Sequence, residues 1–325
     1  MEGFYRGKNI LLTGGAGFVG QLLIDRLLCL DPKVIRILDT RENALFDLRQ
    51  RYTGEDQKTL RFLLGDVRNL NRLLYAFRGI DIVFHTAAYK HVLECEHNPI
   101  DAIETNIVGT SNVIQAAITH NVKKVIYTSS DKAANPSNTM GATKLLGEKL
   151  MIAANTYGAH STVFASCRFG NVVRSSGSVI PLFEEQIARN RRITVTNPAM
   201  TRFIISKEQA VELVLLAGAL AQGGEVFIMK MPAINIGDLA AVMMAKHPGV
   251  SHEIIGKRAG EKMHEELMTE EEMSRAYENQ HLYVVFSHMV DIGRDNYRGF
   301  TKVARVPNSQ DAQRMSTNEI MGLVG

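Results

Sequence analysis

The chain lacks tryptophan and has only three cysteines among its 325 residues. Cys29, Cys95 and Cys167 are an odd number, and their spacing does not fit a metal site. Each stands among or beside apolar neighbours, so we expect buried free thiols in a reducing compartment. No cluster of potential ligands has the spacing of a metal centre, and the sequence therefore predicts none.

Long hydrophobic runs and a surplus of one charge are also missing. The longest apolar stretch, 213–221, is much shorter than the roughly 20 residues of a membrane span. Residues 1–8 lead directly into a strand without the apolar segment of a signal peptide. The net charge of +3 is too balanced to favour nucleic acid. We expect a soluble, cytoplasmic protein with neither a membrane nor a nucleic-acid partner.

What the sequence does contain is a regular alternation of strands and helices. Segments with the composition of buried parallel strands stand at 9–13, 34–38, 60–64, 81–85, 122–128 and 161–167. Six strands alternating with helices predict an α/β fold with a doubly wound parallel sheet (Rossmann). We expect a dinucleotide-binding domain at 1–168 and a smaller, discontinuous substrate-binding lobe at 169–325. The helix near 206–221 should return to the first domain.

A glycine-rich turn lies between the first strand and its helix. Its glycines Gly14, Gly17 and Gly20 are spaced three residues apart, and Phe18 and Val19 lie between the last two. Glycines let the backbone turn tightly and approach a pyrophosphate, which the amides of a helix N-terminus then attract. Because the turn stands between a strand and a helix, it predicts a dinucleotide site.

Asp39 ends the second strand, about twenty residues beyond the glycine turn. At this position a carboxylate can accept hydrogen bonds from the hydroxyls of the adenosine ribose. It favours NAD over NADP. Arg41 leaves NADP possible, because a guanidinium could pair with a 2′-phosphate. After the third strand, Asp66 and Val67 either contact adenine or begin a helix. Ala87 and Ala88 follow the fourth strand and would let backbone lie against the cofactor.

One polar segment follows the fifth strand. Ser130, Asp131 and Lys132 stand together, and Lys144 lies on the helix expected at 140–155, one turn after Met140. A hydroxyl, a carboxylate and two ammonium groups can carry out proton transfers on both faces of a substrate. The alternative is a solvated loop with a helix cap. His85 and His91, near the fourth strand, are more often structural than catalytic.

The second half of the chain has weaker patterning. Segments 169–173 and 177–181 resemble loops, the basic cluster at 189–192 resembles a solvated helix end, and 194–196 and 226–229 resemble short strands. Region 254–268 contains Arg258, Glu261 and Lys262, and several cations on such loops suggest capture of a substrate diphosphate, with scattered surface charge as the alternative. The last forty residues cannot be assigned.

Taken together, these motifs resemble the extended short-chain dehydrogenases/reductases. Within that superfamily the chain is similar to the UDP-N-acetylglucosamine 4,6-dehydratases of bacterial polysaccharide biosynthesis. The resemblance covers roughly residues 8–268 and rests on segments 13–20, 87–92, 130–136, 200–203 and 260–262. It implies oxidation of a UDP-sugar at carbon 4, loss of water across carbons 5 and 6, and return of hydride to carbon 6.

The resemblance also implies residue roles. Asp131 would be the acid for the 6-hydroxyl, and Lys132 the base at carbon 5, with its pKa lowered by burial and by Lys144. The substrate would be held by Lys90, Asn171, Val179, Arg202, Arg258 and Glu261. Helices 103–119 and 140–155 would pair in a homo-oligomer.

Met140 departs from the superfamily pattern, which has a catalytic tyrosine four residues before the lysine. A thioether cannot transfer a proton. A branch of the dehydratases also carries methionine there, so the proton of the 4-hydroxyl would go to Lys144 or Asp131. Two alternatives stay open: a nucleotide-sugar epimerase of the same fold, and a non-catalytic NAD(P)-binding regulator.

Overall fold

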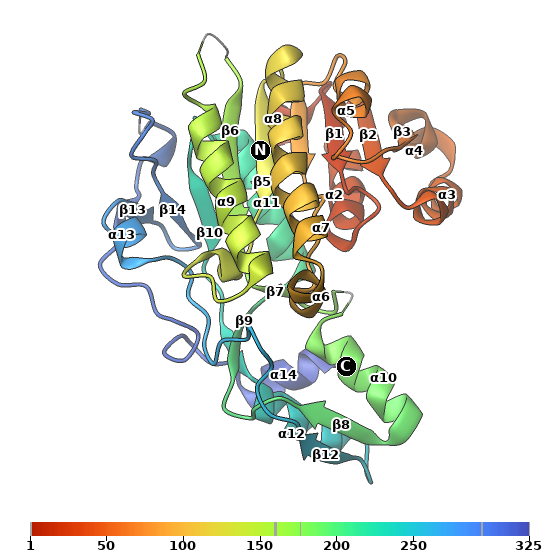
Figure 1. Ribbon diagram of the computed structural model, residues 1–325, viewed down its shortest axis with the longest axis vertical. Coiled ribbons are helices and arrows are strands. Elements are labelled where there is room, and N and C mark those ends of the chain that lie inside the picture. Colours follow the sequence, from red (N-terminus) through yellow and green to blue (C-terminus); the bar gives the residue numbers. More distant parts are fainter. Residues whose placement is uncertain (1, 159–160, 176, 294, 325) are drawn as a thin grey trace.

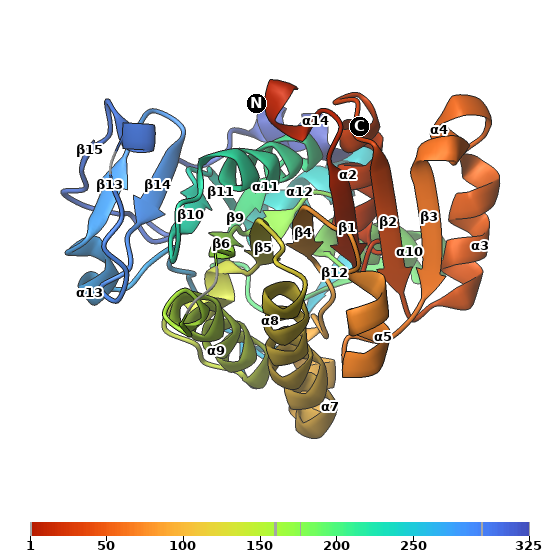
Figure 2. The same cartoon turned by 90° about the horizontal axis from the view of Figure 1, so that it is seen from above.

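The computed structural model describes residues 2–158, 161–175, 177–293 and 295–324. Helices cover both faces of its large sheet, and a smaller lobe lies beyond one end of the strands (Figures 1 and 2). The first six strands are β1 (Asn9–Thr13), β2 (Val34–Asp39), β3 (Leu60–Leu64), β4 (Ile82–His85), β5 (Lys124–Thr128) and β6 (Val163–Arg168). They lie in the order β3-β2-β1-β4-β5-β6, and each pairs with its neighbours in parallel. The predicted doubly wound parallel sheet is confirmed.

Apolar helix faces bury both sides of this sheet. Figure 2 shows α5 (Leu70–Ala76), α8 (Gly109–Thr119) and α9 (Thr139–Ala154) on one side, and α2 (Phe18–Leu28) and α11 (Lys207–Leu220) on the other. The remaining helices of the first half are α1 (Glu2–Tyr5), α3 (Glu42–Arg51), α4 (Gly54–Thr59), α6 (Val92–His97) and α7 (Pro99–Ile103). The helix α11 packs against α2, β5, β6 and β10 (Val226–Met229), and its return to the first domain stays a prediction.

The helix predicted at 103–119 is interrupted. Residues Glu104–Val108 form a π-helical turn between α7 and α8. Such a turn accommodates one extra residue and is frequent at functional sites. Here it places the side chain of Asn106 inside the protein, where it is 1% exposed.

The large sheet continues into the second half of the chain. The strand β10 pairs with β6 in parallel, and β14 (Leu282–Val285), β13 (Ala276–Glu278) and β15 (Thr301–Lys302) follow in antiparallel pairs. The short helix α13 (Glu270–Met273) precedes β13. Part of the chain after residue 168 therefore belongs to the large sheet, and the division into domains at this residue stays a prediction.

The smaller lobe has its own apolar core. It contains α10 (Val179–Asn190), α12 (Ile236–Lys246), α14 (Thr317–Val324), β8 (Arg192–Val195), β12 (Ser251–Ile254), β7 (Asn171–Val172), β9 (Thr201–Ile205) and β11 (Ala233–Asn235). Phe183, Leu239 and Ile320 meet in this core. In Figure 1 these elements lie below the carboxyl ends of the parallel strands.

Two loop predictions about this half are only partly right. Segment 177–181 is a loop at Gly177 and Ser178 only, because α10 begins at Val179. Pro181 stands in the first turn, where a helix does not use its backbone N–H. Segment 169–173 contains the short strand β7. The basic cluster at 189–192 does lie at a helix end, since α10 ends at Asn190.

The cysteines are free, but not all are buried. Cys95 and Cys167 are buried as expected, whereas Cys29 is exposed, which corrects that prediction. Cys29 is the C-cap residue of α2, next to Asp25 and Arg26 of the last turn, whose side chains are only partly buried. Within the described ranges, no group of three or more His, Cys, Asp or Glu is arranged to hold a metal ion. Likewise, none of the described helices is long and apolar enough to cross a membrane.

Candidate active site

A cavity of about 950 Å³ opens at the carboxyl ends of β1, β4 and β5, between the large sheet and the smaller lobe. This is the edge at which open α/β sheets bind their ligands. Its lining includes every predicted site residue except Asp131: Gly14, Gly17, Phe18, Val19, Asp39, Arg41, Asp66, Val67, Ala87, Ala88, Lys90, Ser130, Lys132, Met140, Lys144, Asn171, Val179, Arg202, Arg258 and Glu261. The fold thus brings the predicted cofactor, catalytic and substrate residues to one place.

The glycine turn is shaped for close approach. Gly14 has φ +67°, and a Cβ there would lie 2.6 Å from the backbone nitrogen of Ala87. The helix α2 begins at Phe18, and its N-cap, Gly17, supplies no side-chain cap. The first amides of the helix therefore remain available to an anion, and the turn fits the pyrophosphate of a dinucleotide.

Asp39 already has several donors. Its Oδ2 accepts a hydrogen bond from the backbone of Ala16 at 3.0 Å, and its Oδ1 accepts one from the backbone of Arg41 at 3.0 Å. The Arg41 guanidinium also binds Oδ1, at 3.1 Å through Nε. Ribose hydroxyls would compete with this guanidinium, whose side chain is 57% exposed.

Asp66 does not cap a helix. Its carboxylate binds the Arg68 guanidinium at 2.6 Å, while the N-cap of α5 is Asn69, whose side chain accepts from the backbone of Arg72. The helix-cap alternative is therefore wrong. A contact between Asp66 and adenine stays a prediction.

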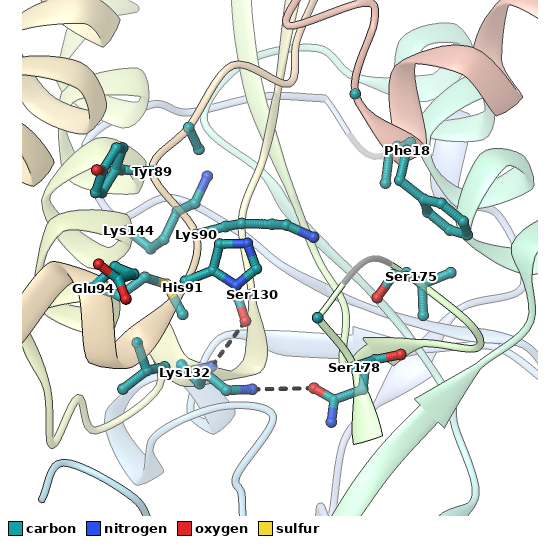
Figure 3. A pocket seen from close by; sticks show the side chains of 18 of the residues that line it. Phe18, Tyr89, Lys90, His91, Glu94, Ser130, Lys132, Lys144, Ser175 and Ser178 are labelled. Carbon is teal, nitrogen blue, oxygen red and sulfur yellow. Dashed lines mark hydrogen bonds between the residues drawn. The ribbon is translucent and has the colours of Figure 1, made fainter. Parts of the chain in front are cut away.

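The polar segment after β5 forms a hydrogen-bonded network. Asp131 Oδ1 accepts from Ser130 Oγ at 2.9 Å and from Lys132 Nζ at 2.9 Å. Lys132 Nζ also donates to Asn171 Oδ1 at 3.3 Å. Figure 3 shows Ser130, Lys132 and Lys144 on one side of the cavity, with Ser175 and Ser178 facing them. The alternative of a solvated loop is wrong, because this segment is enclosed.

Asp131 itself lies behind the cavity wall. Its side chain is fully buried, and Oδ2 has no partner among the described atoms. Ser130 and Lys132 stand between this carboxylate and the cavity. Any proton exchanged between Asp131 and a sugar would therefore pass through one of these two neighbours.

The two lysines of the site differ in proton affinity. Burial lowers the pKa of Lys144 to about 8, and its Nζ donates to the backbone oxygen of Thr128 at 2.7 Å. Burial also disfavours the charged form of Lys132, but Asp131 and Glu265 outweigh it and raise its pKa above the usual value. The expectation that the pKa of Lys132 would be lowered is therefore wrong.

Met140 is buried beside Lys144. It is 4% exposed and packs with Cys95, Ala102 and Val92. Its thioether closes the wall at the position where the superfamily has a tyrosine, and it offers no exchangeable proton.

The histidines differ from each other. His85 is fully buried between Thr13 and Thr110, with ring nitrogens 2.7 and 3.0 Å from their hydroxyls. Burial lowers its pKa to about 3, so it stays neutral and structural, as expected. His91 lines the cavity beside Lys90 (Figure 3).

The sequence reasoning missed two buried polar residues. Asn106 binds the loop after β4, accepting from the backbone nitrogen of Tyr89 at 2.7 Å and donating to Tyr89 O and to Thr143 Oγ1, each at 2.9 Å. A polar residue inside an apolar helical pattern was the available signal. Glu265 is 3% exposed and lies 3.8 Å from Arg202. No local pattern distinguished it from the surrounding loop.

Known proteins resemble the chain along nearly its whole length. The model of the family described as polysaccharide biosynthesis protein matches residues 10–287. An uncharacterized membrane protein of Methanocaldococcus jannaschii is 45% identical over 98% of this chain and 96% of its own. A UDP-N-acetylglucosamine 4,6-dehydratase (inverting) of Campylobacter jejuni is 42% identical over 86% and 83%. A UDP-glucose 4-epimerase of Rickettsia bellii is 39% identical over 98% and 95%.

Solved structures agree with this fold. Pen from Bacillus thuringiensis superposes with a TM-score of 0.92, at 42% identity, over 99% of both chains. The dTDP-glucose 4,6-dehydratase DesIV from Streptomyces venezuelae, solved with NAD bound, has a TM-score of 0.70 at 20% identity, over 78% of this chain and 86% of its own. The latter likeness concerns the fold alone. By its family match and its relatives, the chain belongs to the polysaccharide biosynthesis protein family of extended short-chain dehydrogenases/reductases.

Proposed function

We propose that this nucleotide-sugar-modifying enzyme is a 4,6-dehydratase acting on UDP-N-acetylglucosamine. The observation that carries the proposal is the hydrogen-bonded network in which Ser130 and Lys132, on the wall of the cavity, bind Asp131 behind that wall. Removing water across carbons 5 and 6 requires one group that takes a proton and one that gives a proton. A carboxylate and an ammonium group 2.9 Å apart supply this pair. The name of the Campylobacter relative supports the same reaction.

NAD is the proposed cofactor. When bound, it would accept hydride from carbon 4 and return it to carbon 6. Gly14, Gly17 and the start of α2 would hold its pyrophosphate, and Asp39 its adenosine ribose. The DesIV structure with NAD supports this choice by fold. Arg41 keeps NADP as the alternative, since its guanidinium lies at the ribose position.

The sugar nucleotide would occupy the part of the cavity toward the smaller lobe. Arg202 and Arg258 can neutralise a diphosphate there, together with Lys90. Glu261 holds the backbone of Arg258, accepting a hydrogen bond at 3.1 Å. Asn171 and Val179 complete this side of the wall. Cytoplasmic location and a homo-oligomer formed through α8 and α9 stay predictions.

An epimerase is the second candidate, because the Rickettsia relative carries that name over nearly the whole chain. Epimerization shares the oxidation at carbon 4 and needs no proton transfer at carbons 5 and 6. The Asp131–Lys132 pair therefore favours the dehydratase. If no reaction occurred, Met140 would support the remaining alternative, a non-catalytic regulator that binds NAD(P).

The test is incubation of the purified protein with UDP-N-acetylglucosamine in deuterated water, with NAD or with NADP. Mass spectrometry and NMR should show loss of one water and deuterium at carbon 5. Asp131→Asn should bind the cofactor normally and form no dehydrated product, since an amide cannot exchange this proton. A product with an inverted 4-hydroxyl and no loss of water would show that the protein is an epimerase and not a dehydratase. Unchanged sugar would support the regulator.

A further inference from the structure

A turn that follows β12 of the smaller lobe reaches the cavity at residues 258–261. Arg258 and Glu261 line the cavity. They also close the turn, because the Arg258 nitrogen donates to Glu261 Oε2 at 3.1 Å and the Glu261 nitrogen donates to the Arg258 oxygen at 3.3 Å. The chain that leads into the turn, residues 251–259, is exposed throughout. With its side chains in solvent, this part of the chain depends on polar contacts for its position.

The contacts that fix the turn come from the loop before α9. Gly260 O accepts hydrogen bonds from Ser137 Oγ at 3.0 Å and from Asn138 Nδ2 at 2.9 Å. Just beyond the turn, Lys262 Nζ donates to Ala134 O at 2.9 Å. Three hydrogen bonds thus join segments that lie 122 to 128 residues apart in the chain.

Gly260 permits this close approach because it has no side chain. Its φ of +77° lies in the left-handed region, and a Cβ there would be 2.9 Å from the Cβ of Asn138. Segment 260–262, on which the family resemblance partly rests, therefore contains two residues, Gly260 and Lys262, that bind the loop before α9.

Asn138 has a second partner at the start of α9. It is the N-cap of this helix, and its Oδ1 accepts from the Gly141 nitrogen at 2.8 Å. A single amide group therefore binds the turn through its nitrogen and the helix through its oxygen. The same helix carries Met140 and Lys144, which both line the cavity.

The start of α9 also packs against the polar segment after β5. A side chain at Gly141 would collide with the backbone oxygen of Lys132. The helix contacts the 3₁₀ turn Asp131–Ala133 along its first residues. Because the two segments are in such close contact, the first turn of α9 cannot shift without moving Lys132.

We propose that Asn138 is a positioning residue that couples capture of a nucleotide diphosphate by the turn 258–261 to the placement of the first turn of α9. This role rests on the proposed function, which places the diphosphate against Arg258. A bound diphosphate holds the turn in place, and Asn138 passes this restraint to the helix that carries Lys144. Because such coupling is reciprocal, a loosened Asn138 contact also weakens nucleotide binding.

The first test separates the two contacts of this side chain. In Asn138→Asp a carboxylate still caps α9, but it cannot donate to Gly260 O. The affinity for UDP, measured by calorimetry, should fall by up to about tenfold, because the turn spends less time in its binding position. Ser137→Ala removes the other hydrogen bond to Gly260 O without a change of charge and should weaken UDP binding in the same direction.

A double-mutant cycle with Arg258→Ala decides whether Asn138 acts through the turn. Once Arg258 cannot bind the diphosphate, Asn138→Asp should lower the UDP affinity further by less than about twofold. A loss equal to that in the wild-type background would show that Asn138 does not act through Arg258, and the proposal would be wrong.

The second test follows the helix. In the wild type, saturating UDP should slow hydrogen exchange of the backbone amides in the first turn of α9. In Asn138→Asp this slowing should be largely lost. A purely structural defect would change exchange with and without UDP alike and would leave the difference intact. Equal slowing in both proteins would therefore contradict the coupling.

Matched variants complete the design. Asn69→Asp places the same charge at the N-cap of α5, on an exposed residue, and should change neither readout. If Asn138→Asp folds poorly, Ser137→Ala can take its place in the cycle with Arg258→Ala. Failure of the wild type to bind UDP would refute the proposed substrate, whereas UDP binding with independent effects of the two substitutions would refute the role of Asn138 alone.

Discussion

At the scale of single residues, Lys144 shows how burial of a charged group lowers the stability of the fold. Its side chain is 5% exposed, and its pKa is about 8, against an ordinary value of 10.5. The unfolded chain therefore binds a proton at this lysine between about pH 8 and pH 10.5, where the folded chain does not. At neutral pH the charged Lys144 therefore lowers the free energy of unfolding. This destabilising effect disappears as the pH rises from about 8 to about 10.5.

We predict that Lys144→Met is more stable than the wild type at pH 7 and loses this advantage above pH 10. Methionine has a similar shape and no charge to desolvate. The shift in pKa corresponds to about 3 kcal/mol at neutral pH, as an upper value. Urea unfolding of both cofactor-free proteins across this pH range would measure it.

Lys149→Met is the matched control, because Lys149 is exposed on the same helix, α9. Its difference from the wild type should not change with pH. A constant difference between Lys144→Met and the wild type would show that burial does not perturb Lys144.

At the scale of elements, the sequence predicts what local patterns determine. The six parallel strands and the glycine turn were found because apolar runs, turns and helix starts lie within short segments. The helix α10 was missed because Gly177 and Pro181 look like loop residues, although proline is accepted in a first turn. Glu265 was missed for a different reason: its ion pair with Arg202 joins residues far apart in the chain, and no local pattern reports it.

The π-helical turn before α8 has a definite structural role. It directs Asn106 toward both Tyr89 and Thr143, and three hydrogen bonds join the loop after β4 to α9. Tyr89 and Lys90 line the cavity. One irregular turn thus connects a cavity wall to the helix that carries Lys144.

We predict that Asn106→Ala destabilises the protein by about 2–4 kcal/mol, because the partly buried backbone nitrogen of Tyr89 loses its acceptor and its backbone oxygen keeps only the weak donor Cys95 Sγ, 3.7 Å away. It should also raise the KM for the sugar nucleotide, since Lys90 follows Tyr89 directly. Gln115→Ala, an exposed change on α8, should leave both unchanged. Normal stability of Asn106→Ala in chemical unfolding would show that water replaces these hydrogen bonds.

At the scale of the whole molecule, the last forty residues connect the two parts of the fold. Tyr297 packs against Phe286 and Phe300 beside the large sheet. Further on, Ser309 binds the segment that carries Glu265, and α14 packs against α12 in the smaller lobe. This stretch, which has no recognisable sequence pattern, holds the wall of the cavity between sheet and lobe.

Ser309 is the centre of that connection, and it gives the last prediction. Its hydroxyl is fully buried, accepts from the backbone of Glu265 at 2.8 Å and lies 2.7 Å from Thr201 Oγ1, next to Arg202. Ser309→Ala should cost about 1–3 kcal/mol of unfolding free energy, because the Glu265 amide loses its acceptor. It should also lower kcat/KM more than Gln310→Ala, an exposed change one residue later. A loss of stability with unchanged kcat/KM would mean that the tail supports the fold without positioning Glu265 and Arg202.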